Sequence, residues 1–132
     1  IEPTRINSLN MLHLELRRAA LVSLLPSGNR WVVVLGPTIV DPPQALEMTR
    51  GISPDGSAFA EVLGNGFATL RELEHPHVGD RLFIVPMEGP PQGALARQAF
   101  VDFDILPSSH GLVIRPKSEA LRAAVFRTQV VD

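Results

Sequence analysis

Apolar residues along the chain fall into patterns that predict four strands. Residues 30–35, RWVVVL, are rich in β-branched side chains and are followed by a Gly-Pro pair, which is typical of a buried strand. A compact apolar run predicts a second strand over 81–86. Residues 96–106 alternate between apolar and polar side chains, and another apolar run follows over 111–115. The last three segments are joined by short loops, so we expect them to form an antiparallel meander.

Residues 8–25 favour a helix. Leucine, alanine and arginine dominate this range, and its apolar residues recur at helical spacing behind Ser8, a suitable N-cap. The alternative is a strand from Met11 to Arg17, because the leucines at 12, 14 and 16 alternate with polar residues.

Three further helices are predicted over 43–50, 57–74 and 118–127. Asp41 is expected to cap the first of them, and Ser118 the last. Residues 57–74 carry apolar side chains at helical spacing, although the Gly-Asn-Gly sequence within this range allows a hairpin instead.

These elements predict an α+β fold in which a small antiparallel sheet packs with helices; the alternative is a mainly-β sandwich or barrel. Ser53–Gly56, SPDG, has the residue types of a tight turn. The length of 132 residues fits one domain over 1–132. Residues 1–10 are expected to be either an extended arm or a non-native leader, since translation could begin at Met11.

Composition removes several kinds of chemistry. The chain has no cysteine, which excludes disulfides and thiolate sites, and no cofactor is expected. Its net charge of −2 does not favour binding to phosphate backbones. No apolar run reaches the length of a membrane helix, so we expect a soluble protein without a membrane span. From its class alone, we expect it in a virion or in the cytoplasm.

The sequence EHPHVGD, residues 74–80, carries the most conspicuous polar cluster. His75 and His77 would point to one side of an extended backbone, and Asp80 could add a third metal ligand. His13 and His110 stand at no recognised spacing from them. Because a proline separates the two histidines, we interpret the segment as a turn that leads into the strand at 81, not as a metal site.

Asp102 and Asp104 could form a carboxylate pair for acid–base chemistry, because they lie on one face of the predicted strand 96–106. We interpret them as the solvated side of that strand. The chain has no nucleophile elbow, dinucleotide fingerprint or phosphate-binding loop. No catalytic residue is therefore assigned.

The sequence accordingly predicts a non-catalytic structural or assembly subunit that acts through protein–protein contacts. We expect copies of the chain itself or a neighbouring assembly subunit as partners, as in a virion, a connector or a secretion apparatus. A helix over 8–25 would be apolar on nearly every side, which a small monomer cannot cover. The expected interface residues are Leu14, Leu21, Leu25, Phe100 and Leu106.

Two alternative functions remain open. One is a small nucleic-acid-binding module, for which Arg115 and Arg122 are the test positions. The other is a metal-dependent enzyme centred on His75 and His77 with Asp80.

Overall fold

The structure is a computed structural model that describes residues 2–6, 9–37, 43–74 and 81–125. Every regular element in these ranges is a strand, and none of the described residues is helical. The strands are β1 (Glu2–Ile6), β2 (Leu9–His13), β3 (Leu21–Ser27), β4 (Arg30–Gly36), β5 (Gln44–Ala45), β6 (Glu47–Ile52), β7 (Ala58–Leu63), β8 (Arg71–Glu74), β9 (Arg81–Val85), β10 (Gln92–Gly93), β11 (Gln98–Ala99), β12 (Phe103–Leu106) and β13 (Leu112–Pro116).

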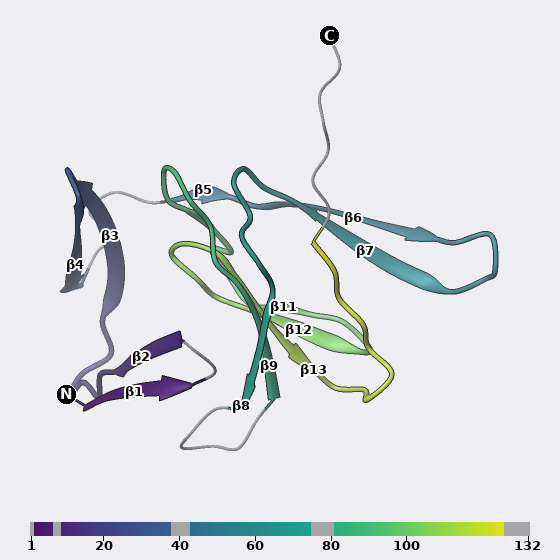
Figure 1. The fold of residues 1–132 in the computed structure, drawn as a ribbon, viewed down its shortest axis with the longest axis horizontal. Coiled ribbons are helices and arrows are strands. Elements are labelled where there is room, and N and C mark those ends of the chain that lie inside the picture. Colours follow the sequence, from purple (N-terminus) through teal and green to yellow (C-terminus); the bar gives the residue numbers. More distant parts are fainter. Residues whose placement is uncertain (1, 7–8, 38–42, 75–80, 126–132) are drawn as a thin grey trace, which may run out of the picture.

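The predicted α+β fold is therefore wrong, and the mainly-β alternative fits the structure. A central antiparallel sheet has the strand order β11-β12-β13-β9-β8 (Figure 1). The other strands form two-stranded pairs: β1 with β2, β3 with β4, β6 with β7, and β5 parallel to β10.

Strands occur at the four predicted places, but their pairing differs from the expected meander. Residues 96–106 form two strands, because a bend at 101–102 folds β11 back against β12. In the sheet, β9 lies between β8 and β13 and does not pair with β11 or β12, which come before β13 in sequence. This crossover gives β9 a neighbouring strand on each side, and Leu82, Phe83 and Val85 on it are buried.

The helix predicted over 8–25 is wrong, because this range contains β2 and most of β3. Residues 21–27 pair antiparallel with residues 30–36 along their whole length. Helix propensities of ordinary residues differ by less than about 1 kcal/mol each, so pairing with a valine-rich partner strand overrides them. The alternative strand from Met11 to Arg17 overlaps β2 only as far as His13.

The helices predicted over 43–50 and 57–74 are also wrong, because these ranges hold β5 to β8. The SPDG segment is the turn that the sequence predicts, and it joins β6 to β7: the amide of Gly56 donates to the carbonyl of Ser53 at 2.8 Å, and the φ angle of Gly56 is 90°. Asp41, the expected helix cap, lies outside the described residues.

The hairpin considered at Gly64–Gly66 is not formed either, because β7 pairs with β6 while β8 pairs with β9. Gly66 has a φ angle of 78°, and a side chain there would meet the backbone of Glu88. The glycines instead mark the bend at which the chain enters the central sheet.

The described part of the predicted helix 118–127 is irregular. Its only regular feature is a single turn, in which the amides of Ala120 and Leu121 donate to the hydroxyl and the carbonyl of Ser118. Val125 then packs against the core. Residues 126 and 127 lie outside the described ranges.

The hydrophobic core lies in the C-terminal two thirds of the chain. Its central cluster consists of Val85, Ala94, Ile105 and Leu112, against which half-buried side chains of β6 and β7 pack. Among the residues whose burial the structure describes, every buried apolar residue falls between positions 73 and 112. Among residues 14–37, only Ser23 is buried. Residues 14–37 are thus rich in apolar side chains but add none of them to the buried core.

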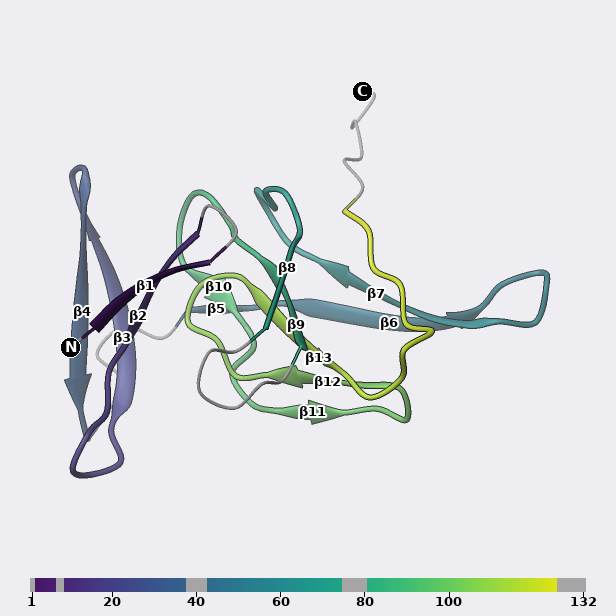
Figure 2. The ribbon, with the colours of Figure 1, turned by 60° about the horizontal axis from the view of Figure 1, so that its bottom comes forward.

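Two hairpins extend from opposite ends of the molecule. The β3–β4 hairpin lies at one end of the long axis, and the β6–β7 hairpin projects at the other; both views agree on this arrangement (Figures 1 and 2). We call the first the ribbon (residues 21–36) and the second the arm (residues 44–63).

Candidate protein–protein interface

The ribbon forms because a two-residue turn joins two apolar strands. Gly28 and Asn29 make the turn, and Ser27 pairs with Arg30 across it. The φ angle of Gly28 is 62°, a value that matches the right-handed twist of a tight hairpin and that only glycine adopts easily. No other described strand pairs with β3 or β4, so neither outer edge of the ribbon is extended by a third described strand.

Both faces of the ribbon are apolar. Opposite residues of an antiparallel pair point to the same side, so the register divides the side chains into two sets. One face contains Ser23 among leucines and valines, with Ser27 and Arg30 beside the turn. The other face has no polar side chain, and Val33 on it is 51% exposed. Its members are Val22, Leu24, Pro26, Trp31, Val33 and Leu35.

Within the described residues, a ring contact and a hydrogen bond join the ribbon to the segment 109–110. The rings of Trp31 and His110 lie with their centroids 5.2 Å apart. The hydroxyl of Ser109 donates to the carbonyl of Val22 at 3.4 Å. Trp31 is still 49% exposed. An isolated two-stranded hairpin is marginally stable in water. A ribbon with this much exposed apolar surface is therefore expected to bind another protein surface that buries it.

The arm resembles the ribbon in architecture but is anchored better. Met48 and Val62 form a cross-strand pair at its base and pack on the core. The guanidinium of Arg50 lies 4.2 Å from the centroid of the Phe100 ring, and this contact holds the next cross-strand pair on the same face, Arg50 with Ala60. Beyond it, Ile52 on the same face is 76% exposed. The apolar stripe of this face thus continues past the point at which the body of the protein covers it.

The other face of the arm carries Phe59 and Leu63, which are 42% and 52% exposed. Phe59 lies across from Gly51, and its ring occupies the space that a side chain at Gly51 would need. No other described strand pairs with β6 or β7, so the arm also has two open edges.

The two ends of the molecule carry opposite charge. The segment 14–37, which includes the ribbon, has three arginines and one acid, a net charge of +2. The arm has three acids and one arginine, a net charge of −2. The charged residues are Arg17, Arg18, Arg30 and Glu15 in the first segment, and Glu47, Asp55, Glu61 and Arg50 in the second.

Asp104 is the centre of a buried ion cluster and not part of a solvated strand face. Its side chain is fully buried, and its carboxylate lies 2.6 Å from Arg97, 2.7 Å from Arg115 and 3.0 Å from Lys117. Arg115 stands directly across from it on β13. The interaction with Arg115, followed by those with Lys117 and Arg97, holds the pKa of Asp104 well below its usual range, although desolvation alone would raise it.

This cluster differs from the predicted interpretation of the Asp102–Asp104 pair. Asp102 is exposed, whereas Asp104 stays ionised because three cations surround it. A carboxylate held in this state is a poor general base. The cluster joins the chain before β11 to β12, to β13 and to the segment after β13, so we assign it a structural role.

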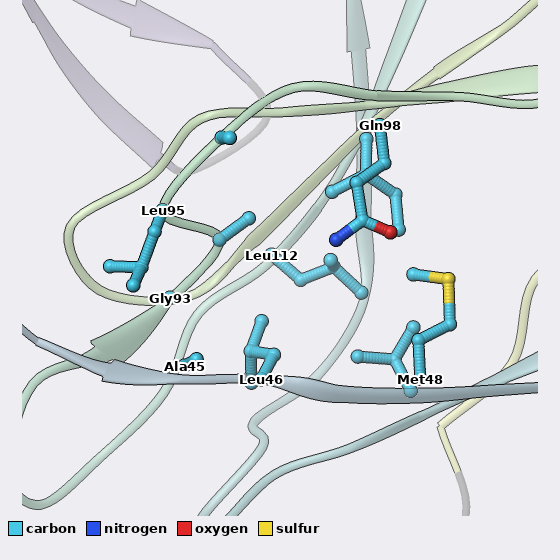
Figure 3. A pocket seen from close by; sticks show the side chains of 11 residues that line it. Ala45, Leu46, Met48, Gly93, Leu95, Gln98 and Leu112 are labelled. Carbon is cyan, nitrogen blue, oxygen red and sulfur yellow. The ribbon is translucent and has the colours of Figure 1, made fainter.

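An apolar cavity of about 170 Å³ lies where the base of the arm meets the sheet (Figure 3). Leu46 and Met48 line it from the arm side, and Ile105 and Leu112 from the sheet side. Leu95, which also lines it, is 58% exposed. None of the lining residues is titratable, so the cavity offers space for apolar groups but no acid–base chemistry.

The candidate metal ligands His75, His77 and Asp80, and the turn expected in their place, lie outside the described residues. Within the described ranges, no three histidine, aspartate or glutamate side chains gather as a metal site would require. His110 accepts a hydrogen bond at Nδ1 from the amide of Gln92, 3.2 Å away, and its ring faces Trp31.

The predicted interface residues fall into two separate groups. Leu14 and Leu21 are 39% and 47% exposed, and Leu25 is half-buried on β3. Leu106 is half-buried on β12 of the central sheet, and half-buried Phe100 precedes this strand and stacks on Phe103. Sequence reasoning missed the other ribbon residues, because the run RWVVVL was expected to be a buried strand. It is a strand, but its side chains are exposed: Trp31, Val32, Val33 and Leu35.

Comparison with protein families, with curated proteins and with solved structures returns no match for this chain. In the part of the chain that the structure describes, no helix has the length and apolarity needed to cross a bilayer.

Proposed function

We propose that this chain is a non-catalytic assembly subunit that acts by binding other protein chains, first of all copies of itself. The observation that carries the proposal is the ribbon: seven-residue strands with apolar side chains on both faces, in a segment that buries no apolar residue. Apolar surface of this kind is characteristic of sites that another protein covers.

The backbone supports the same proposal. An open strand edge can pair with a strand of another chain, and natural proteins usually protect such edges with charges, prolines or bulges. The ribbon has two open edges with a single proline, Pro26, near its turn. Assembly would pair these backbone groups and remove the apolar side chains from water in one step.

A nucleic-acid-binding function draws less support. Arg115 and Lys117, which belong to the most basic part of the chain, are already bound to Asp104. Their charge is therefore partly neutralised within the fold and is not concentrated on an open surface.

The experiment is to replace Leu14 and Leu21 with glutamate and to compare particle mass by light scattering. Both side chains are exposed, so the double variant is expected to fold, and the proposal predicts a smaller particle than wild type. Val101→Glu is the matched control, since Val101 is 92% exposed but lies on neither the ribbon nor the arm. An unchanged mass in the double variant, with the fold intact by circular dichroism, would count against the proposal.

A further inference from the structure

The two hairpins differ in the charge they bring to an interface. The ribbon carries Arg30 and no acid, a charge of +1, and the adjoining residues 14–20 add a further +1. Contact between two ribbons would therefore bring together two positive segments, and contact between two arms would bring together two segments of charge −2. Contact between a ribbon and an arm joins opposite charges. Because like charges across an interface disfavour association and opposite charges steer it, the mixed contact is the favoured one.

The apolar residues of the two hairpins are also matched. The ribbon offers Val33 and Leu35 on its wholly apolar face, and the arm offers Ile52 at its free end with Leu63 on its outer face. Each of these side chains is at least 40% exposed. Each hairpin also has open strand edges, so backbone pairing can accompany the apolar contact.

The two hairpins cannot meet within one molecule, because they lie at opposite ends of its long axis (Figures 1 and 2). A partner for the arm must therefore come from another chain. Two complementary patches on opposite ends of a subunit are the geometry of a heterologous contact, which produces a ring if it closes and a filament if it does not.

We propose that the arm of one copy docks on the ribbon of a second copy, so that the subunits assemble head to tail. This inference rests on the proposed assembly function and specifies the contact through which it operates. Pairing through the strand edges places Ile52 beside exposed side chains on one face of the next subunit's ribbon, and Phe59 and Leu63 beside those on its other face. Glu47, Asp55 and Glu61 then lie near Arg17, Arg18 and Arg30.

Two single substitutions test the proposal, one at each end. Val33→Asp blocks the ribbon and Ile52→Asp blocks the arm; both positions are highly exposed, so both variants are expected to fold. Each variant alone still has one intact end but no complementary partner end, so each is expected to sediment as a 14.4 kDa monomer. Val101→Asp is the control and is expected to assemble like wild type.

Mixing the two blocked variants gives the decisive result. The intact arm of the Val33→Asp chain can bind the intact ribbon of the Ile52→Asp chain, and both remaining ends are blocked. The mixture is therefore expected to form a 1:1 dimer of twice 14.4 kDa and no larger species. Contacts between identical surfaces cannot give this outcome, since each variant would then behave the same alone and mixed.

The possible failures are distinguishable. Suppose that the wild-type chain forms multimers. If the single variants also form multimers, or if their mixture stays monomeric, the head-to-tail contact is overturned but the assembly function is retained. A wild-type chain that stays monomeric, whether or not it binds a different protein, overturns the head-to-tail contact. If either variant fails to fold by circular dichroism, Leu35→Asp and Leu63→Asp replace them at the same two ends.

Discussion

The ring of Trp31 on β4 packs against the ring of His110, with an angle of 37° between their planes. This contact joins the ribbon to the body of the protein. It uses only part of the indole, because about half of the Trp31 surface remains exposed. One part of the Trp31 ring therefore makes an internal contact, and we expect a second subunit to cover the exposed part.

Trp31 is the only tryptophan, and the chain has no tyrosine, so its fluorescence reports on the ribbon alone. We predict that the emission maximum moves to shorter wavelength as protein concentration rises, because assembly removes the indole from water. The Val33→Asp variant should keep the dilute-solution spectrum at every concentration. A wild-type spectrum that does not change with concentration, despite a rising particle mass, would show that the ribbon is not the interface.

Gly93 on β10 has no room for a side chain. A β-carbon there would overlap the carbonyl oxygen of Ser108, whose backbone cannot move without disturbing the bond between its amide and the carbonyl of Ala94. Gly93→Ala is expected to lower the free energy of unfolding by about 1–3 kcal/mol, as overpacking does. Gly36→Ala is the matched control, because no atom lies within 4 Å of the added carbon, and it should change stability by less than about 0.5 kcal/mol. Urea denaturation measures both, and equal effects would contradict the packing described for Gly93.

Asp104 makes the stability of the fold depend on acid pH. Its pKa in the folded state is lower than in the unfolded chain, so the stabilisation is complete above the unfolded value of about 4 and is lost as the pH falls below it. We predict that the urea midpoint of the wild type falls between about pH 5 and pH 2, and that Asp104→Asn lowers the midpoint at neutral pH and flattens this fall. Some dependence of stability on pH will remain in the variant, because hydrogen bonds from Ser57 also lower the pKa of Asp55.

If Asp104→Asn does not fold, Arg97→Gln serves in its place. It removes the most exposed of the three cations and leaves Arg115 and Lys117 bound to the carboxylate. A smaller loss of stability at neutral pH is then expected. A pH profile identical to wild type in both variants would show that the cluster does not control acid unfolding.

The cavity under the arm predicts that a slightly larger side chain can stabilise the protein. Val62 lines the cavity and is half-buried on β7, where a β-branched residue suits the strand. Val62→Ile is expected to raise the free energy of unfolding by about 0.5–1 kcal/mol, and Val62→Ala to lower it by about 1–2 kcal/mol. Thermal unfolding followed by circular dichroism measures the pair, and a destabilised Val62→Ile variant would mean that the cavity cannot accept another methyl group.

The sequence predicted strands well where β-branched residues were concentrated, as in RWVVVL, and it predicted the SPDG turn from residues that act locally. It failed over 8–25 and 57–74, where leucine, alanine and glutamate favour helices by small local preferences. In the fold, residues 21–27 pair with β4 and residues 58–63 pair with β6, each across a tight turn, and such pairing is not visible in local composition.

The interface was predictable only in part. An excess of apolar residues near the N-terminus indicated an uncovered surface, but the expected cause, a helix, was wrong. The ion cluster around Asp104 was not predicted, because its three cations stand 7 to 13 residues away in sequence and approach it through the pairing of β12 with β11 and with β13. The sole local signal was an aspartate between Phe103 and Ile105 in an alternating strand.

The most direct test of assembly is sedimentation velocity of the full wild-type chain over a wide range of concentrations. We predict species heavier than the 14.4 kDa monomer, with a mass that grows as concentration rises and shrinks when Val33 is replaced with aspartate. A single 14.4 kDa species at every concentration would contradict the proposal that copies of this chain cover one another's apolar hairpins.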